Sequence, residues 1–143
     1  MSNRNTHPNT TACEQAKRFL TKIDRMNRRI EAMMETADGY IKKSRHEGAM
    51  SDVVIKTFVN LAAELQQESV KLRKTVDKAR KIIDLLDSED EKLLVELRYF
   101  HGLKIESIAN IMRCCRATVY NIQQSAINHV QEMIDNKLVS IDE

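Results

Sequence analysis

One unbroken apolar pattern in the middle of the chain limits its fold more than any other feature. Between residues 58 and 86, small or apolar residues recur at alternating intervals of four and three. A helix with this spacing buries one narrow side along a neighbouring helix. The residues of the pattern are Phe58, Ala62, Leu65, Ser69, Leu72, Val76, Ala79, Ile83 and Leu86.

A second series with the same spacing precedes the first. It runs from Ala16 to Tyr40, and the polar stretch 42–52, which contains Gly48, separates the two series. Two long helices joined by a short polar connection fold back on each other, so residues 12–87 are predicted to form a long antiparallel helical hairpin. Ser51 or Asp52 is suited to cap the second helix.

The composition favours an all-α protein. The 143 residues include only 3 Gly, 1 Pro and no Trp, and aromatic residues make up 4%. Few helix breakers and few β-forming aromatics favour helices. Phosphate-binding loops need clustered glycines, whereas the glycines here stand alone in the sequence. Because no catalytic arrangement of Ser/His/Asp, Cys/His or paired carboxylates stands out, we expect a protein that is not an enzyme and needs no cofactor or metal.

The two ends of the chain are predicted to lie outside the folded part. Residues 1–11 have the polar composition of a disordered leader, and residues 135–143 are expected to form a fraying tail. The leader has no apolar segment typical of a signal peptide, and no apolar run approaches the roughly 18 residues of a membrane span. The 3 cysteines are an odd number and form no secreted disulfide framework. We therefore expect a cytoplasmic protein with no membrane partner.

Residues 88–134 are predicted to form a separate domain of three helices. Ser88 with Glu91 has the spacing of a capping box before the first segment, 89–100, and Gly102 suits a left-handed helix end. A short helix over 104–112, a turn over 113–115 and a longer helix from Arg116 to about residue 134 are typical of a helix-turn-helix. The apolar residues expected to face inward are Leu93, Leu94, Leu97, Phe100, Ile105, Ile108, Ala109, Met112, Val119, Ile122, Ala126, Val130 and Met133.

The opposite side of the last helix is polar. At about 100° per residue, five residues share this side, and their chemistry suits the edges of DNA bases. Arginine pairs with guanine, Asn and Gln pair with adenine, and Ala contacts a thymine methyl group. The residues predicted to read the major groove are Arg116, Ala117, Tyr120, Asn121 and Gln124, and those predicted to contact phosphates are Arg113, Lys104 and Thr118.

Residues 85–130 resemble region 4 of sigma-70-type factors. The matching pieces are Leu97-Arg98-Tyr99, Gly102-Leu103, Ile105-Glu106-Ser107-Ile108-Ala109 and Ala117-Thr118-Val119-Tyr120. With its heptad-rich basic front half, the layout resembles small transcription regulators of phages and mobile elements. The resemblance implies sequence-specific binding of double-stranded DNA and contact with RNA polymerase. Two positions depart from the family: Arg113 replaces a turn glycine, and Cys115 replaces a capping Ser or Thr.

The charge distribution leaves the source of DNA affinity open. Residues 88–134 hold 5 basic and 6 acidic residues, a net charge of −1, whereas DNA affinity comes largely from Lys and Arg on phosphates. Either the basic clusters of the hairpin contact flanking phosphates, or RNA polymerase holds the protein on DNA and weak contacts suffice.

Further apolar residues beside the two heptad series predict that the hairpin either forms a homodimer or docks on a partner. They are Leu20, Met34, Ile41, Val54, Ile55, Leu61, Val70 and Ile82. An alternative function is a coiled-coil adaptor or anti-activator that binds protein and no DNA. A third is a thiol-responsive regulator that uses Cys114 and Cys115, whose spacing from His101 and His129 is not that of a zinc site.

Overall fold

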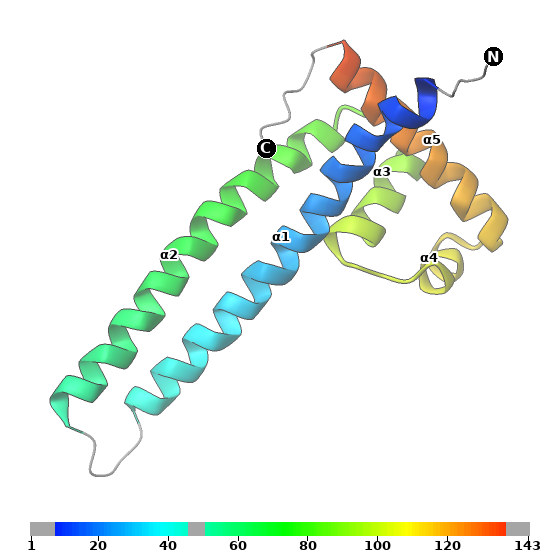
Figure 1. The fold of residues 1–143 in the computed structure, drawn as a ribbon. Coiled ribbons are helices and arrows are strands. Elements are labelled where there is room, and N and C mark those ends of the chain that lie inside the picture. The colour runs from blue at the N-terminus through cyan, green and yellow to red at the C-terminus, as the bar shows by residue number, and fades with distance from the viewer. Residues whose placement is uncertain (1–7, 46–50, 137–143) are drawn as a thin grey trace. The chain divides into compact units, whose positions relative to one another are not determined.

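The protein is predominantly helical in the part that its computed structural model describes, residues 8–45 and 51–136, with side chains from Cys13 onward (Figure 1). The prediction of an all-α fold is confirmed, since those residues contain no strand. Within the same ranges, no helix is both long and apolar enough to cross a membrane. The elements are α1 (Pro8–Ser44), α2 (Asp52–Ile83), α3 (Glu89–Val95), the π-helical η1 (Glu96–Phe100), α4 (Ile105–Met112) and α5 (Arg116–Asp135).

The start of α2 has its predicted cap, whereas the start of α1 departs from its predicted range. Ser51 Oγ accepts a hydrogen bond from the Val54 N–H at 3.3 Å, as expected at the start of α2. Residues 8–11 were predicted as part of a disordered leader, but α1 begins at Pro8. Proline is favoured in the first turn of a helix because its missing N–H needs no partner there. The rest of that leader and residues 137–143 of the predicted tail lie outside the described residues.

The chain divides into two compact units. The middle unit is Arg25–Asp77, and the terminal unit combines Met1–Asp24 with Lys78–Glu143. The boundary predicted between residues 87 and 88 falls inside the terminal unit. The long helices α1 and α2 each contribute one part to the middle unit and one part to the terminal unit.

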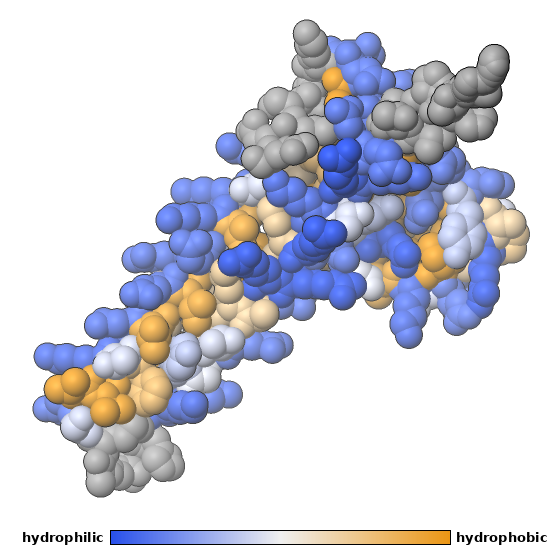
Figure 2. Space-filling view, viewed as in Figure 1, coloured by the Kyte–Doolittle hydropathy of each residue, from blue (hydrophilic) through white to orange (hydrophobic). Residues whose placement is uncertain are grey.

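In the middle unit, α1 and α2 run side by side in opposite directions (Figure 1). The rings of Tyr40 and Phe58 stack with their centroids 5.8 Å apart, and Ser69 Oγ lies 3.4 Å from Met34 Sδ. The buried Ser69 hydroxyl also donates to the Gln66 carbonyl oxygen at 2.7 Å, so its polarity is satisfied within α2. Apolar side chains nevertheless remain visible in a band along this pair of helices (Figure 2).

In the terminal unit, the start of α1 packs against α5. Gln131 of α5 is buried and accepts the backbone N–H of Ala16 at 2.9 Å, while its amide nitrogen donates to Gln15 Oε1 at 3.0 Å. Leu20, expected to support self-association, is instead fully buried in this unit. The buried apolar residues here include Cys13, Ala16, Leu20, Ile23, Ile83, Leu86, Leu94, Val95, Phe100, Ile105, Ile108, Val119, Ala126, Ile127, Val130 and Met133.

The π-helical segment changes which residues face the core. The sequence pattern predicted Leu93 as an inward residue, but Leu93 is exposed and Val95 is buried instead. In η1 the His101 N–H bonds to the Glu96 carbonyl oxygen, five residues back, at 3.1 Å. This wider turn returns Phe100 to the buried side, where α-helical geometry would have turned it away.

The side chains of Arg80 and Glu96 hold η1 in place at its two ends. The Arg80 guanidinium lies over the Phe100 ring, 4.2 Å from its centroid, and forms an ion pair with Glu96. The second Glu96 oxygen lies 3.0 Å from His101 Nε2. The end of α2 is thereby tied to the segment that leads into α4.

Glu91 plays a different role from the one its position suggested. The Ser88 hydroxyl accepts the Glu91 N–H at 3.3 Å, as in a capping box. The Glu91 side chain, however, is only 5% exposed and turns toward α5. Its carboxylate accepts a hydrogen bond from Ser125 Oγ at 2.9 Å and one from His129 Nδ1 at 2.6 Å. This buried carboxylate therefore joins α3 to α5.

The Glu91–His129 pair predicts a pH dependence of stability. The hydrogen bond that His129 donates to Glu91, with weaker attraction from Glu132 and Asp87, raises the pKa of His129 above its ordinary value of 6.5, although partial burial opposes the shift. The folded protein therefore binds this proton more tightly than the unfolded chain does. The stabilisation is complete below about pH 6.5 and is lost as the pH rises through the raised pKa.

We expect urea unfolding to show a decrease in the free energy of unfolding between about pH 6 and pH 8 that His129→Gln removes. Because the His129 side chain is 49% exposed, solvent screening limits the effect to about 1 kcal/mol or less. His101→Gln serves as the control for a general loss of imidazole. Equal pH profiles for the wild type and His129→Gln would contradict the assignment.

Candidate nucleic-acid interface

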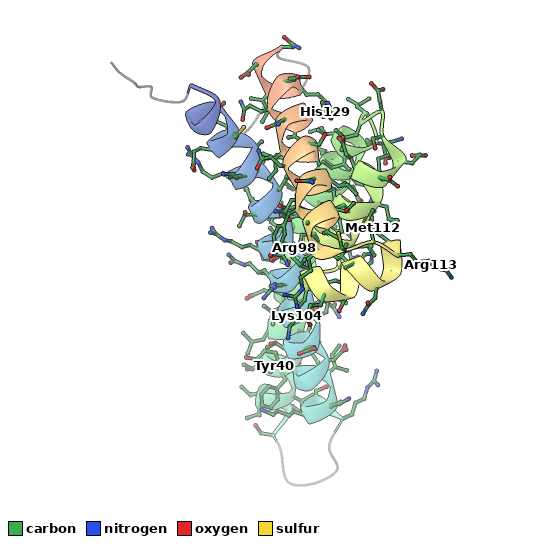
Figure 3. The ribbon with its side chains drawn as sticks, turned by 90° about the vertical axis from the view of Figure 1, so that its right-hand side faces the viewer. Tyr40, Arg98, Lys104, Met112, Arg113 and His129 are labelled. Carbon is green, nitrogen blue, oxygen red and sulfur yellow. The ribbon has the colours of Figure 1, made fainter. Side chains whose placement is uncertain are left out.

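The connection between α4 and α5 is a tight turn with a left-handed residue. Arg113 has φ 56° and ψ 48°, the conformation that glycine adopts most easily. The Cys114 N–H bonds to the Ala109 carbonyl oxygen, five residues back, at 3.0 Å. This is the bond that closes a helix end of the Schellman type. Arg113, which stands where the resemblance to sigma-70-type factors expects a turn glycine, therefore has the backbone conformation of a glycine, and its long side chain projects outward (Figure 3).

The first turn of α5 begins at Arg116, as predicted, but its cap is weak. Cys115 occupies the N-cap position with extended backbone and makes no capping hydrogen bond through its side chain. Its Sγ lies 3.3 Å from the Thr118 hydroxyl. That hydrogen bond, with smaller effects of nearby backbone N–H groups, lowers the pKa of the exposed Cys115 thiol.

The predicted reading residues all lie on the exposed side of α5. Arg116, Ala117, Asn121 and Gln124 are exposed, and Tyr120 is 53% exposed. The opposite side of the helix is buried in the terminal unit. It contains Val119, Ala126, Ile127, Val130 and Met133, while Ile122, predicted to be internal, is half-buried.

Two of the reading residues already hold partners within the protein. Arg116 forms an ion pair with Glu106, which lies in the first turn of α4. The Gln124 amide nitrogen donates to Asn128 Oδ1 at 3.0 Å, and the same oxygen accepts from Cys13 Sγ at 3.3 Å. The exposed side of α5 is thus connected through Asn128 to the start of α1.

The residues predicted to contact phosphates do not form one cluster. Lys104 and Arg113 are both exposed, but they occupy the N-cap and the C-cap of α4, at opposite ends of that helix (Figure 3). The Thr118 hydroxyl is exposed and engaged with Cys115. Arg98, half-buried, donates to the Leu103 carbonyl oxygen at 3.1 Å and holds the connection between η1 and α4. Cations near the exposed side of α5 are therefore few.

Sequence reasoning missed two residues that shape this surface. From the sequence, Glu106 was identified only as part of the segment that resembles sigma-70-type factors. An acidic side chain in the first turn of α4 nevertheless lies within reach of the arginine at the start of α5. Asn128 follows Gln124 by four residues, the spacing at which helical side chains meet, and this was the available signal.

The surface shows no sign of a metal site. Among the residues that the structure describes, no three His, Cys, Asp or Glu side chains lie close enough together to hold an ion.

Comparison of the chain with protein-family models, with curated proteins and with solved structures finds no significant match.

The left-handed conformation of Arg113 predicts that glycine stabilises the turn. A non-glycine residue in this conformation is strained by about 1 kcal/mol or more, because its Cβ approaches the backbone. Arg113→Gly should raise the free energy of unfolding by about 1 kcal/mol in urea titrations. Arg113→Ala removes the same charge but keeps the Cβ, so it separates strain from electrostatics. If Arg113→Gly were less stable than Arg113→Ala, that result would contradict the left-handed conformation of residue 113.

Proposed function

We propose that this protein is a sequence-specific DNA-binding regulator of transcription that places α5 in the major groove. In this proposal α4, the turn and α5 act as a helix-turn-helix, and the antiparallel part of α1 and α2 acts as a helical hairpin. The observation that supports it most is the exposed polar side of α5 opposite a side that is buried along its length. Such a division leaves base-reading side chains outward on a rigid helix.

The proposed roles follow from the chemistry of each side chain. Arg116 would donate two hydrogen bonds to a guanine, and Asn121 and Gln124 would each pair with an adenine. Ala117 would contact a thymine methyl group, and Tyr120 would contact the sugar-phosphate backbone. Arg113, Lys104 and Thr118 remain the proposed phosphate contacts. As a regulator of transcription, the protein would act in the cytoplasm on double-stranded DNA.

The low charge of the domain bears on how it would bind. Residues 88–134 carry a net charge of −1, and Arg116 is partly neutralised by Glu106. Since each neutralised phosphate steepens the salt dependence of binding, the free protein should bind weakly with a shallow salt slope. The resemblance to sigma factors supplies a second contact, because attachment to RNA polymerase would raise the effective concentration of the domain at DNA.

Truncation of two reading residues tests the role of α5. Arg116→Ala and Gln124→Ala should each weaken binding to a duplex selected from a random pool by about 1–3 kcal/mol, because each loses a paired contact with one base. Fluorescence anisotropy measures the affinity, and circular dichroism checks that helicity is unchanged. Asn60→Ala, an exposed amide on α2, is the matched control. Wild-type affinity in both α5 variants would contradict the proposal.

The Arg116–Glu106 pair gives a second prediction about the same surface. Glu106→Gln removes the competing carboxylate, so that on a duplex without the selected guanine the Arg116 guanidinium is free to contact a phosphate instead of a base. Binding to random duplex should strengthen, and the slope of log K against log salt should steepen by about 0.9, the value for one added phosphate contact. Glu132→Gln, an exposed acid on α5 away from Arg116, should leave the slope unchanged. Equal slopes in Glu106→Gln and the wild type would rule out this role of the ion pair.

The second candidate function is a protein-binding adaptor or anti-activator. The exposed apolar side chains of the middle unit favour it, because such residues commonly mark protein contacts. It predicts no mobility shift with any duplex of a random pool, with or without RNA polymerase, whereas the DNA-binding proposal predicts a selected sequence.

A further inference from the structure

The middle unit has an apolar stripe that its own core covers only in part. Val54, Leu61, Leu65 and Leu72 follow one another on α2 at intervals of 7, 4 and 7, which places them on one narrow side of the helix. Val54 and Leu61 are 40% and 36% exposed, and Leu65 and Leu72 are half-buried. The side chains of α2 that are buried in this unit, Ala62, Ser69 and Val76, lie beside the stripe rather than on it. Figure 2 shows the resulting band of apolar surface.

Basic residues line the α1 edge of this stripe. Lys43 Nζ lies 5.8 Å from the centroid of the Phe58 ring, so Lys43 is on the same side of the helix pair as Phe58. Arg25 and Arg29 share this side of α1, because 18 residues, the interval from Arg25 to Lys43, make five turns. All three cations are exposed.

Acidic residues line the other edge. Glu64 and Glu68 each follow a leucine of the stripe by three residues, so they lie at its outer border on α2. Both are exposed, and Glu68 makes an exposed 3.5 Å ion pair with Lys71. The surface therefore has a basic edge, an apolar centre and an acidic edge.

We propose that this stripe binds the same stripe of a second copy of the chain. A two-fold axis parallel to the helices would place α2 of one copy against α2 of the other. Each α1 then lies beside the border of the partner's α2 that faces away from the partner's own α1. The basic edge of each copy therefore meets the acidic edge of the other. An isologous contact of this kind is self-complementary, as a closed dimer requires.

The size of the stripe sets the expected strength of the dimer. The interval of 18 residues from Val54 to Leu72 spans about 27 Å at 1.5 Å per residue, and two helices side by side are about 20 Å wide. The product is on the order of 500 Å² per copy, or about 1,000 Å² in total, which is the lower end for a specific interface. We therefore expect a reversible dimer with a micromolar dissociation constant. This inference does not depend on DNA binding.

Sedimentation equilibrium of the full chain tests the proposal. Near 100 μM, about a hundredfold above a micromolar dissociation constant, the wild type should approach twice the chain mass of 16.5 kDa. Leu61→Glu should reduce the mass to that of one chain, because it places a charge in the apolar centre. Val70→Glu is the matched control: Val70 is 51% exposed on the other side of α2, and its variant should remain dimeric.

Further variants separate folding from association and test the geometry. If circular dichroism shows Leu61→Glu to be unfolded, Val54→Glu, at the exposed end of the stripe, takes its place. Arg29→Glu should weaken the dimer, and Arg29→Glu combined with Glu68→Arg should restore it. A monomeric wild type, equal effects of Leu61→Glu and Val70→Glu, or no rescue by the charge exchange would overturn the proposal.

Discussion

Burial of one side of α5 is the constraint on which the rest of the terminal unit depends. Val119 and Val130 are fully buried at positions 11 residues apart, and Ala126 and Ile127 fill the interval. Three hydrogen bonds then fix the rotation of the helix: Ser125 and His129 bind Glu91 of α3, and Gln131 binds the backbone of Ala16. A rotated α5 would leave these buried polar groups without partners, at an expense of about 1–3 kcal/mol each.

The fixed rotation determines which side chains of α5 reach solvent. Tyr120, Asn121 and Gln124 are exposed because the groups behind them are held by packing and hydrogen bonds. Neighbouring side chains already occupy some of the hydrogen-bonding groups that this side of α5 would present to a ligand. Glu106 competes for the Arg116 guanidinium, and Asn128 holds the Gln124 amide. A partner of this surface has to exchange those contacts for its own, which favours a specific ligand over any anion.

The sequence predicted the features that local patterns encode and missed those that depend on distant residues. The heptad spacing indicated the long helices, and Gly102 has the left-handed φ of 67° expected for it. The contact of α1 with α5 joins Ala16 to Gln131, which are 115 positions apart, and no local sequence pattern predicts such a contact. Glu91 has the spacing of a capping box, so its turn toward His129 was invisible in the sequence. Leu93 was wrongly placed in the core, and Val95 was left out of it, because a strict 100° period cannot anticipate the π-helical turn of η1. The exposed positions on α5 agree with expectation, yet their partners Glu106 and Asn128 emerged only from the structure.

The proposed dimer and the proposed DNA contact address the same physical difficulty. A surface with few free cations binds one duplex weakly, and association of two chains through the middle unit would double the number of α5 surfaces in one particle and raise their effective concentration.

The central claim is that the outward side of α5 meets DNA, and oxidative footprinting of tyrosines tests it directly. Tyr120 should be labelled readily in the free protein and protected by a saturating selected duplex, whereas the half-buried Tyr40 of the middle unit should keep its labelling rate. An unchanged labelling rate of Tyr120 with bound duplex would contradict the account.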